Sequence, residues 1–404
     1  MSAARINLDL AVPAVAQTMQ RRSLIVGVAF GIAAIVGLIL APDQFFRSYL
    51  LGWMLCMGLS LGCMAFLMLY YVTGGIWGQP IRRPLEAGMR NVWFMMLLFI
   101  PILFQLKRLY PWARPSEIAH DEHLLHIVHQ YLRPELFILR TVIYFAIWGI
   151  LVYTLTRWSS LQDTPPEKDF AVRFRNLSSP GLVLYGFTIT FASIDWVMSL
   201  DPRWASTIYG LLFLAGEGLS AICFVVVIVV WLWKYSPMRE LLKPDYLQDH
   251  GKLMITFVML WGYFTLSQWL ITWSGNLPDE IRWYMPRTHN GWQGVAYFLV
   301  IFHFFVPFFL LLSKKLKRTP QLVYVALLLL FMRWVDMFWY IEPNFADHQT
   351  RFHLSPQDVI VPVAMAAFWL FLYFRNLRSR PLFAPYDPHT NLLVVPEHHP
   401  TGTL

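Results

Sequence analysis

Ten long apolar runs dominate the sequence, and each is long enough to cross a membrane as a helix. A transmembrane helix needs about 20 mostly apolar residues to span about 30 Å of hydrocarbon. The runs cover residues 23–41, 46–72, 86–106, 136–156, 180–200, 207–233, 253–274, 293–313, 320–341 and 357–374. Because they lack the alternation and frequent turns of membrane strands, the sequence predicts an all-α integral membrane protein with ten transmembrane helices.

The composition excludes a soluble protein. Hydrophobic residues make up 57% of the 404 residues and charged residues only 14%, whereas soluble domains carry about 25% charged residues. Lipid is therefore the expected solvent. The three cysteines are too few for a disulfide framework and are expected to pack as small apolar residues.

The basic residues are distributed unevenly between the two sides of the predicted membrane. Of the 32 Lys and Arg, 20 fall on the side of the termini, 9 on the opposite side and 3 within the spans. Cytoplasmic loops carry such an excess, so we expect both termini in the cytoplasm. The net charge of +8 then reflects topology, and no nucleic-acid partner is expected.

The runs and their connections divide the chain into a cytoplasmic N-terminal segment, four membrane parts and a Pro-rich cytoplasmic tail. The outer loop 107–135 is expected to contain an interfacial helix, and the tail is expected to lie as an extended strap over a neighbour. In chain order, the segments are 1–22, 23–72 (spans 1–2), 86–200 (spans 3–5, with the outer loop), 207–341 (spans 6–9), 357–374 (span 10) and 377–404.

Ionisable groups inside the spans are the candidates for function, because each costs roughly 3 kcal/mol on insertion scales. In or near the spans lie Glu86, Arg90, Arg140, Asp195, Glu217, His303, Arg333 and Asp336, with Ser193, Tyr263, Ser267 and Gln268 beside them. At about 1.5 Å per residue, Asp195 is expected about 8 Å and Glu217 about 15 Å below the outer edge.

The groups on spans five to nine could form a half-channel that passes protons between the middle of the membrane and its outer face. The predicted proton path consists of Asp195, Glu217, His303, Arg333, Asp336, Tyr263 and Ser267. The structural alternative is an ion pair of Arg333 with Asp336 or with Asp195 that only joins helices. His303 could likewise form only a hydrogen bond across the bundle.

The histidines do not predict a metal or haem site. His120, His123, His126 and His129 recur every three residues in the outer loop, so on a helix they would fan around the axis by about 60° per step. A helix touching a partner is favoured there over a metal site. A haem b needs paired axial histidines on facing helices, and only His303 lies deep in a predicted span. We therefore expect no cofactor in this chain.

Two segments carry a resemblance to a known family. They are Ile194-Asp-Trp-Val-Met-Ser-Leu-Asp-Pro202 and Trp204-Ala-Ser-Thr-Ile-Tyr-Gly210. Supporting segments are His120-Asp121, Tyr131-Leu132, Arg140 to Trp148, Gly251 to Met254, Trp261-Gly262-Tyr263, Asn276 to Glu280 and Arg333 to Asp336. Over nearly all ten spans, the chain resembles the membrane component called quinone-binding subunit 2 of alternative complex III, a bacterial quinol:cytochrome c oxidoreductase.

The resemblance implies a fold related to the polysulfide-reductase and nitrite-reductase (NrfD-like) membrane anchors. It has two four-helix bundles, spans 2–5 and 6–9, with flanking helices. It also implies a bacterial inner-membrane complex in which a sister membrane subunit oxidises quinol and other subunits hold haem c and iron–sulfur clusters. For this chain it implies a proton path or a secondary quinone pocket, with Asp195, Glu217, His303, Arg333 and Asp336 on that path.

Two other classes of protein fit the same pattern. A stand-alone secondary transporter would also have ten spans and charges at the membrane midplane, although most spans here lack the Gly or Pro breaks common in transporters. A purely structural membrane anchor would use its charges only as ion pairs.

Overall fold

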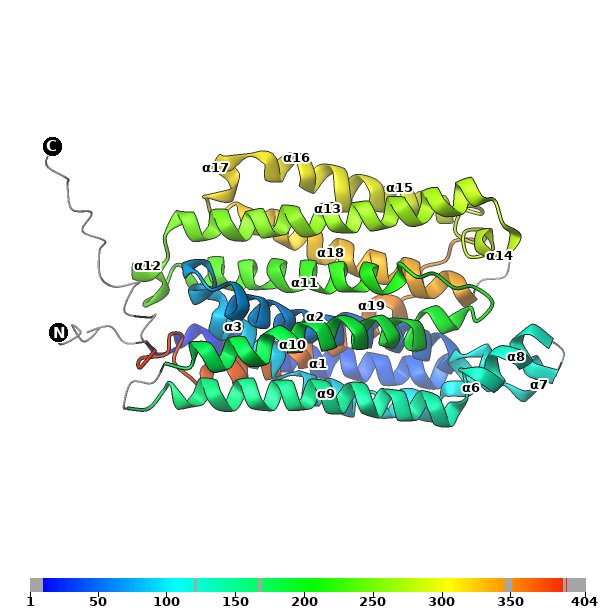
Figure 1. The fold of residues 1–404 in the computed structure, drawn as a ribbon, viewed down its shortest axis with the longest axis horizontal. Helices are drawn as coiled ribbons and strands as arrows, with labels where there is room; N and C mark the ends of the chain where they lie inside the picture. Colours follow the sequence, from blue (N-terminus) through cyan, green and yellow to red (C-terminus); the bar gives the residue numbers. More distant parts are fainter. Residues whose placement is uncertain (1–9, 120–121, 166–168, 346–350, 388–389, 391–404) are drawn as a thin grey trace, which may run out of the picture.

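The regular structure is helical throughout the part of the chain that the computed structural model describes, which is residues 10–119, 122–165, 169–345, 351–387 and 390 (Figure 1). Within these residues, ten helical segments are long and apolar enough to cross a membrane. The prediction of an all-α, multi-pass membrane protein is therefore confirmed.

The ten segments follow the predicted runs in order. They are α1 (Val15–Leu40), α2 (Pro42–Thr73), a broken segment made of η1 (Ile76–Gly78), α3 (Gln79–Met89), α4 (Val92–Leu97) and α5 (Ile100–Phe104), then α9 (Pro134–Leu161), α10 (Ala171–Trp196) with η3 (Met198–Leu200), α11 (Tyr209–Leu232), α13 (Pro244–Gly275), the continuous α15 (Trp292–Leu299), η4 (Val300–Phe305) and α16 (Val306–Leu312), α18 (Leu322–Ile341) with η5 (Glu342–Phe345), and α19 (Gln357–Arg378).

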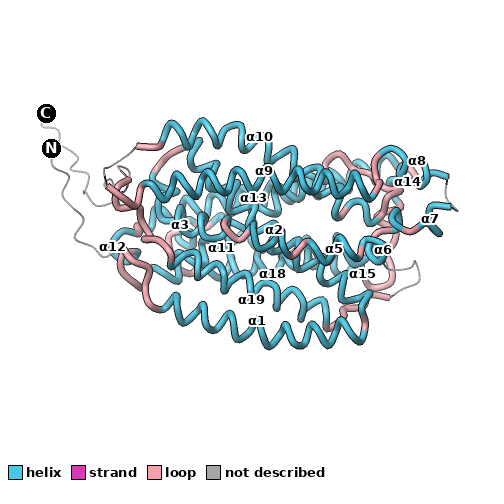
Figure 2. Tube along the Cα trace, turned by 90° about the horizontal axis from the view of Figure 1, so that it is seen from below, coloured by secondary structure: helices cyan, strands magenta, loops and turns pink. Residues whose placement is uncertain are grey.

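Short helices occupy the connections at both ends. They are α6 (Leu106–Leu109), η2 (Pro111–Ala113), α7 (Pro115–Ala119), α8 (Glu122–Gln130), α12 (Met238–Leu241), α14 (Pro278–Ile281) and α17 (Lys314–Lys317). We call the end where α1 begins and α19 ends the termini-side end, and the end that carries α7, α8 and α14 the loop end (Figures 1 and 2).

Four helical segments begin eight or more residues earlier than predicted. The first, third, fifth and seventh start at Val15, Ile76, Ala171 and Pro244 instead of residues 23, 86, 180 and 253. Each early stretch contains charged or polar residues that interrupt the apolar run. A helix satisfies its own backbone hydrogen bonds, so it can continue past the apolar run where side chains supply polar partners.

Helices α2 and α11 form the centre of the molecule, and most of each span is buried. They approach so closely that a Cβ on Gly62 of α2 would overlap the carbonyl oxygen of Glu217 on α11. Small residues allow membrane helices such close contact. Helix α1, by contrast, is mostly exposed and packs mainly against α19, where Gly27 faces the ring of Phe368.

The loop end is tied to the bundle through Arg287, which follows α14. Its buried guanidinium donates to the carbonyl oxygens of Trp339 and Tyr340 at the end of α18 and lies 3.6 Å from the ring centroid of Trp283. Burial lowers the pKa of Arg287 to about 9. The cation satisfies carbonyls that the end of a helix leaves without partners.

Candidate functional site

A Gly-Glu-Gly segment in the middle of α11 organises the buried polar groups. Gly216, Glu217 and Gly218 face three different neighbours, because successive helical residues point about 100° apart. A Cβ on Gly216 would overlap Nη2 of Arg333 on α18, and one on Gly218 would overlap the ring of Phe257 on α13. The two glycines thus make room for side chains of other helices.

The side chain of Glu217 lies between α2 and α10. It is 4% exposed, and the hydroxyl of Tyr185 on α10 donates to its Oε2 over 2.6 Å. Its Cγ approaches Gly58 of α2 so closely that a Cβ there would be 3.2 Å away. Glu217 therefore has one strong hydrogen-bond donor and lies in electrostatic range of Arg333.

Arg333 and Asp336 form an ion pair on one face of α18, between Nη1 and Oδ2, and both side chains are buried. Trp261 of α13 also donates to Asp336 Oδ2, through its indole Nε1 over 3.2 Å. The predicted pairing of Arg333 with Asp336 is thus present, as expected for residues three positions apart.

His303 lies beside this pair in the π-helical turn η4, and it is fully buried. Its ring meets that of Trp261 edge-on, with centroids 4.1 Å apart. Single π-turns inside helices are frequent at functional sites. Trp261 therefore contacts both His303 and Asp336 and joins the two groups.

Around Arg333, Asp336 and His303, four buried polar atoms have no hydrogen-bond partner among the described residues. They are Nδ1 and Nε2 of His303, Oδ1 of Asp336 and Nε of Arg333. Buried polar groups are almost always hydrogen-bonded, and exceptions often mark function or bound water. We call Glu217, Arg333, Asp336, His303 and Trp261 the central cluster. Its free donors and acceptors could exchange protons with internal water.

Asp195 belongs to a separate site on α9 and α10. Arg140 of α9 donates from Nε and Nη2 to its two oxygens at 2.9 and 2.8 Å, and Tyr144 donates to Oδ2 at 2.8 Å. The guanidinium of Arg140 lies 3.9 Å from the ring centroid of Tyr131. Asp195 is fully buried, so this bidentate pair compensates its charge.

The alternative pairing of Arg333 with Asp195 is therefore wrong, because Arg140 on the adjacent antiparallel helix reaches Asp195 instead. The ten residues from Tyr185 to Asp195 on α10 correspond to about 15 Å of helix. Trp148, which donates to Thr188 over 2.8 Å, lies at intermediate height. The structure thus brings Glu217, Arg333, Asp336 and His303 into one region and holds Asp195 apart from them.

Two further predicted residues of α13 do not join the central cluster. The side chain of Tyr263 is 64% exposed and faces away from the bundle. Ser267 is half-buried, and the neighbouring Gln268 accepts a hydrogen bond from Ser206. Because successive residues of a helix point in different directions, Trp261 turns toward Asp336 whereas Tyr263, two residues later, turns outward.

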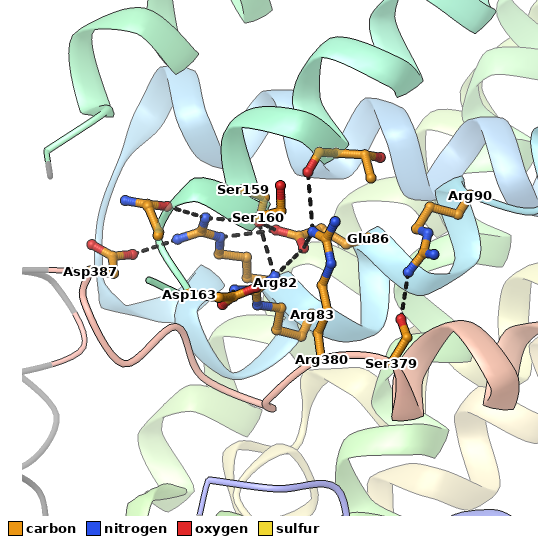
Figure 3. A network of polar contacts seen from close by, with 12 residues as sticks. Arg82, Arg83, Glu86, Arg90, Ser159, Ser160, Asp163, Ser379, Arg380 and Asp387 are labelled. Carbon is orange, nitrogen blue, oxygen red and sulfur yellow. Dashed lines mark hydrogen bonds and ion pairs between the residues drawn. The ribbon is translucent and has the colours of Figure 1, made fainter. Parts of the chain in front are cut away.

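A buried ionic network lies at the termini-side end (Figure 3). Of its residues, only Glu86 is named as a candidate from the sequence. Arg82 and Arg83 of α3 both contact Glu86, at 3.1 and 2.9 Å, and Arg82 also binds Asp387 of the C-terminal segment at 2.5 Å. Ser159 of α9 donates to Glu86 over 2.6 Å. The two arginines resemble an ordinary positive flank in the sequence, and no local signal distinguishes them.

The same network fixes the beginning of the tail. Arg83 binds Asp163 at 2.5 Å, and Arg380 lies 3.7 Å from Glu86. The backbone N–H groups of Leu382 and Tyr386 donate to carbonyls of Leu10 and Gln162. The described part of the tail is thus a strap across the molecule's own termini-side end, while most of residues 388–404 lie outside the described part.

The histidine run of the outer loop lies mostly outside the described part. His120 and the side chains of His123 and His129 are not described, whereas His126 is exposed and contacts Gln130 at 2.9 Å. Among the described residues, no group of three or more His, Cys, Asp or Glu could hold a metal ion. The expected helix in this loop is present as α8.

No family model matches the sequence, and no curated protein is significantly similar to it.

Proposed function

We propose that this chain is a cofactor-free membrane subunit of a quinol-oxidising, cytochrome c-reducing respiratory complex. In this proposal it conducts protons, or holds a secondary quinone, and performs no redox step itself. The central cluster is the observation that carries the proposal: four polar atoms without partners among the described residues lie deep among apolar helices. The sequence resemblance to the quinone-binding membrane component of alternative complex III supplies the class of complex.

The chemistry of the central cluster suits stepwise proton transfer. Glu217 and Asp336 can bind protons, and His303 can exchange one at either ring nitrogen. Arg333 stays positively charged and stabilises whichever carboxylate is ionised. A cluster that only joined helices would be expected to satisfy its polar atoms, because a partly satisfied buried network costs stability.

The same proposal includes the arrangement of helices and the topology. α2, α3–α5, α9 and α10 would form one four-helix bundle, and α11, α13, α15–α16 and α18 the other, with α1 and α19 flanking them. The membrane would be the bacterial inner membrane. The termini-side end would face the cytoplasm because it carries the excess of Lys and Arg. Partners would be a sister quinol-binding membrane subunit, haem c subunits and an iron–sulfur subunit.

Neutralising Asp336 tests the residue assignment. In membranes that contain the assembled complex, Asp336→Asn should leave subunit composition unchanged and lower the rate of quinol turnover, and of the proton release coupled to it, by roughly tenfold or more. Asp195→Asn is expected to lower it less, because Asp195 is paired within its own site. Asp279→Asn, in the exposed turn of α14, is the control. Full turnover and full proton release in both test variants would defeat the assignment.

A secondary transporter is the second candidate, and broken helices favour it. The third segment is divided into α3, α4 and α5, with Pro84 and Pro101 inside it, and the eighth contains the π-turn η4. Transporters place interrupted helices at their substrate sites. Proton-coupled uptake by the purified chain alone in liposomes, abolished by Asp336→Asn, would favour this candidate over the respiratory subunit.

A purely structural anchor predicts the opposite behaviour. If the charges served only as ion pairs, replacing Arg140 and Asp195 together by Met and Asn would cost little function once the protein has folded. The same double replacement at Arg333 and Asp336 would also be tolerated. Loss of proton release in the second pair, with normal assembly, would exclude the anchor.

A further inference from the structure

Two acidic side chains from different helices meet at the loop end, away from the central cluster. Glu342 begins η5 at the end of α18, and Asp358 lies in the first turn of α19. Their side chains lie within hydrogen-bonding range of each other. They are buried, with 7% and 1% of the residue exposed.

Asp358 is surrounded by hydrogen-bond donors. Its Oδ1 accepts from Ser48 Oγ at 2.6 Å and from Gln44 Nε2 at 2.8 Å, both on α2, and its Oδ2 accepts from the backbone N–H of Ser355 at 2.9 Å. It also lies at the N-terminus of α19, where the helix dipole favours negative charge. A carboxylate with three donors is strongly stabilised in its ionised form.

Glu342 has the opposite surroundings. Its Oε1 is buried and has no hydrogen-bond partner among the described residues. The charged side chain that acts on it from α2 is Arg47, whose guanidinium stacks 4.5 Å over the ring of Phe345. Neither carboxyl group forms an ion pair with a Lys or Arg of the described part, so a second negative charge here would be opposed only by the longer-range attraction of Arg47.

From this geometry we propose that Glu342 and Asp358 share one proton and form a proton-binding site at the loop end of the bundle. Glu342 carries the proton and donates it in a hydrogen bond to the ionised Asp358, as two carboxyl groups in contact do when both cannot be charged. The pair then has one negative charge, and each carboxyl group has a partner.

The pair of Glu342 and Asp358 lies closer to the loop end than the central cluster does. Glu342 follows Asp336 by six positions, which corresponds to about 9 Å along the helix. If the chain conducts protons as proposed above, the pair is the group that exchanges them with the loop side. This role rests on the proposed function, whereas the shared proton does not.

Infrared spectroscopy of the full chain in its resting state tests the shared proton directly. A protonated carboxyl group has a C=O stretch distinct from that of a carboxylate, so the spectrum of Glu342→Gln subtracted from that of wild type should show the loss of one such band. The amide that this substitution introduces can still donate to Asp358, so the variant should fold. Asp43→Asn, whose side chain is 69% exposed and paired with Arg108, should leave the band unchanged.

Asp358→Asn gives an independent reading. It removes the negative charge that keeps Glu342 protonated and that accepts its hydrogen bond, so the C=O band should either be lost as Glu342 ionises or move to higher frequency. An unchanged carboxyl band in Glu342→Gln, or an unshifted one in Asp358→Asn, would overturn the proposal. So would loss of the wild-type band when sodium chloride replaces choline chloride, because the pair would then hold a metal cation. None of these measurements requires turnover. Their failure would overturn the shared proton without contradicting the proposed function, and the reverse also holds.

Discussion

At the scale of single residues, the buried charges fall into two kinds. Asp195 has a full set of partners in Arg140 and Tyr144. His303 has neither ring nitrogen bonded to a described residue, although it is fully buried. Fully paired groups such as Asp195 are expected to stabilise the contact between two helices. Groups without partners such as His303 are expected to take part in proton transfer, and substitutions distinguish the two roles.

Arg140 is expected to matter as a bidentate partner. Arg140→Met leaves the buried carboxylate of Asp195 without its cation and should cost about 3 kcal/mol of unfolding free energy. Arg140→Lys should cost less but still be destabilising, because one ammonium cannot match both carboxylate oxygens. Adding Asp195→Asn to Arg140→Met should recover part of the loss. Unfolding in detergent followed by circular dichroism measures all three, and equal stability of Lys and Arg would contradict the bidentate role.

His303 is expected to be dispensable for stability but not for proton movement. His303→Phe keeps a ring against Trp261 and removes no hydrogen bond to a described residue, so the unfolding free energy should change by about 1 kcal/mol or less. Proton release should fall if the imidazole carries protons. Equal proton release in the Phe variant and wild type would remove His303 from the path.

At the scale of helices, the packing of α11 depends on its glycines. Gly216→Ala would place a methyl group on Nη2 of Arg333, displacing the guanidinium and disturbing its pair with Asp336. We expect a loss of about 1–3 kcal/mol from overpacking, together with reduced proton release. Gly186→Ala on α10 is the matched control, because its Cβ meets nothing within 4 Å. It should be neutral or slightly stabilising, and a similar loss in both variants would contradict the steric account.

The extent of the helices can be predicted from sequence where apolar residues are continuous. All ten segments follow from the length of the runs, but hydropathy places the start of the third about ten residues late. Arg82 and Arg83 count against a span in any hydropathy profile, and their partners Glu86 and Asp387 are brought together only by the fold. The π-turn at His303 likewise has no sequence signal that we identified.

Pairings between helices are the least predictable part of the site. The i, i+3 spacing predicts Arg333 with Asp336. Arg140 is recognisable as a residue within a span, but not as the partner of Asp195, because sequence spacing fixes neighbours on one helix and not across two. Tyr185 beside Glu217 is missed for the same reason. Tyr263 is placed on the predicted path only by its expected height in the membrane. Its position around the helix axis turns its side chain outward.

At the scale of the whole molecule, the tail closes the termini-side end. Asp387→Asn should weaken this closure by about 3 kcal/mol, because it removes one partner of a buried ion pair with Arg82. The exposed pair of Arg318 with Asp245 is a matched control at the same end, and Asp245→Asn should cost about 1 kcal/mol or less. Limited proteolysis and thermal unfolding measure both, and equal effects would contradict the buried network.

We propose that this membrane chain belongs to a respiratory complex and holds no redox cofactor itself. The most direct test is to tag the chain, extract it in mild detergent, and record the optical spectrum and band pattern of the purified material. The account predicts haem c absorbance at fixed stoichiometry, together with an iron–sulfur subunit and a second membrane subunit. A colourless, solitary protein of 47.2 kDa would contradict it.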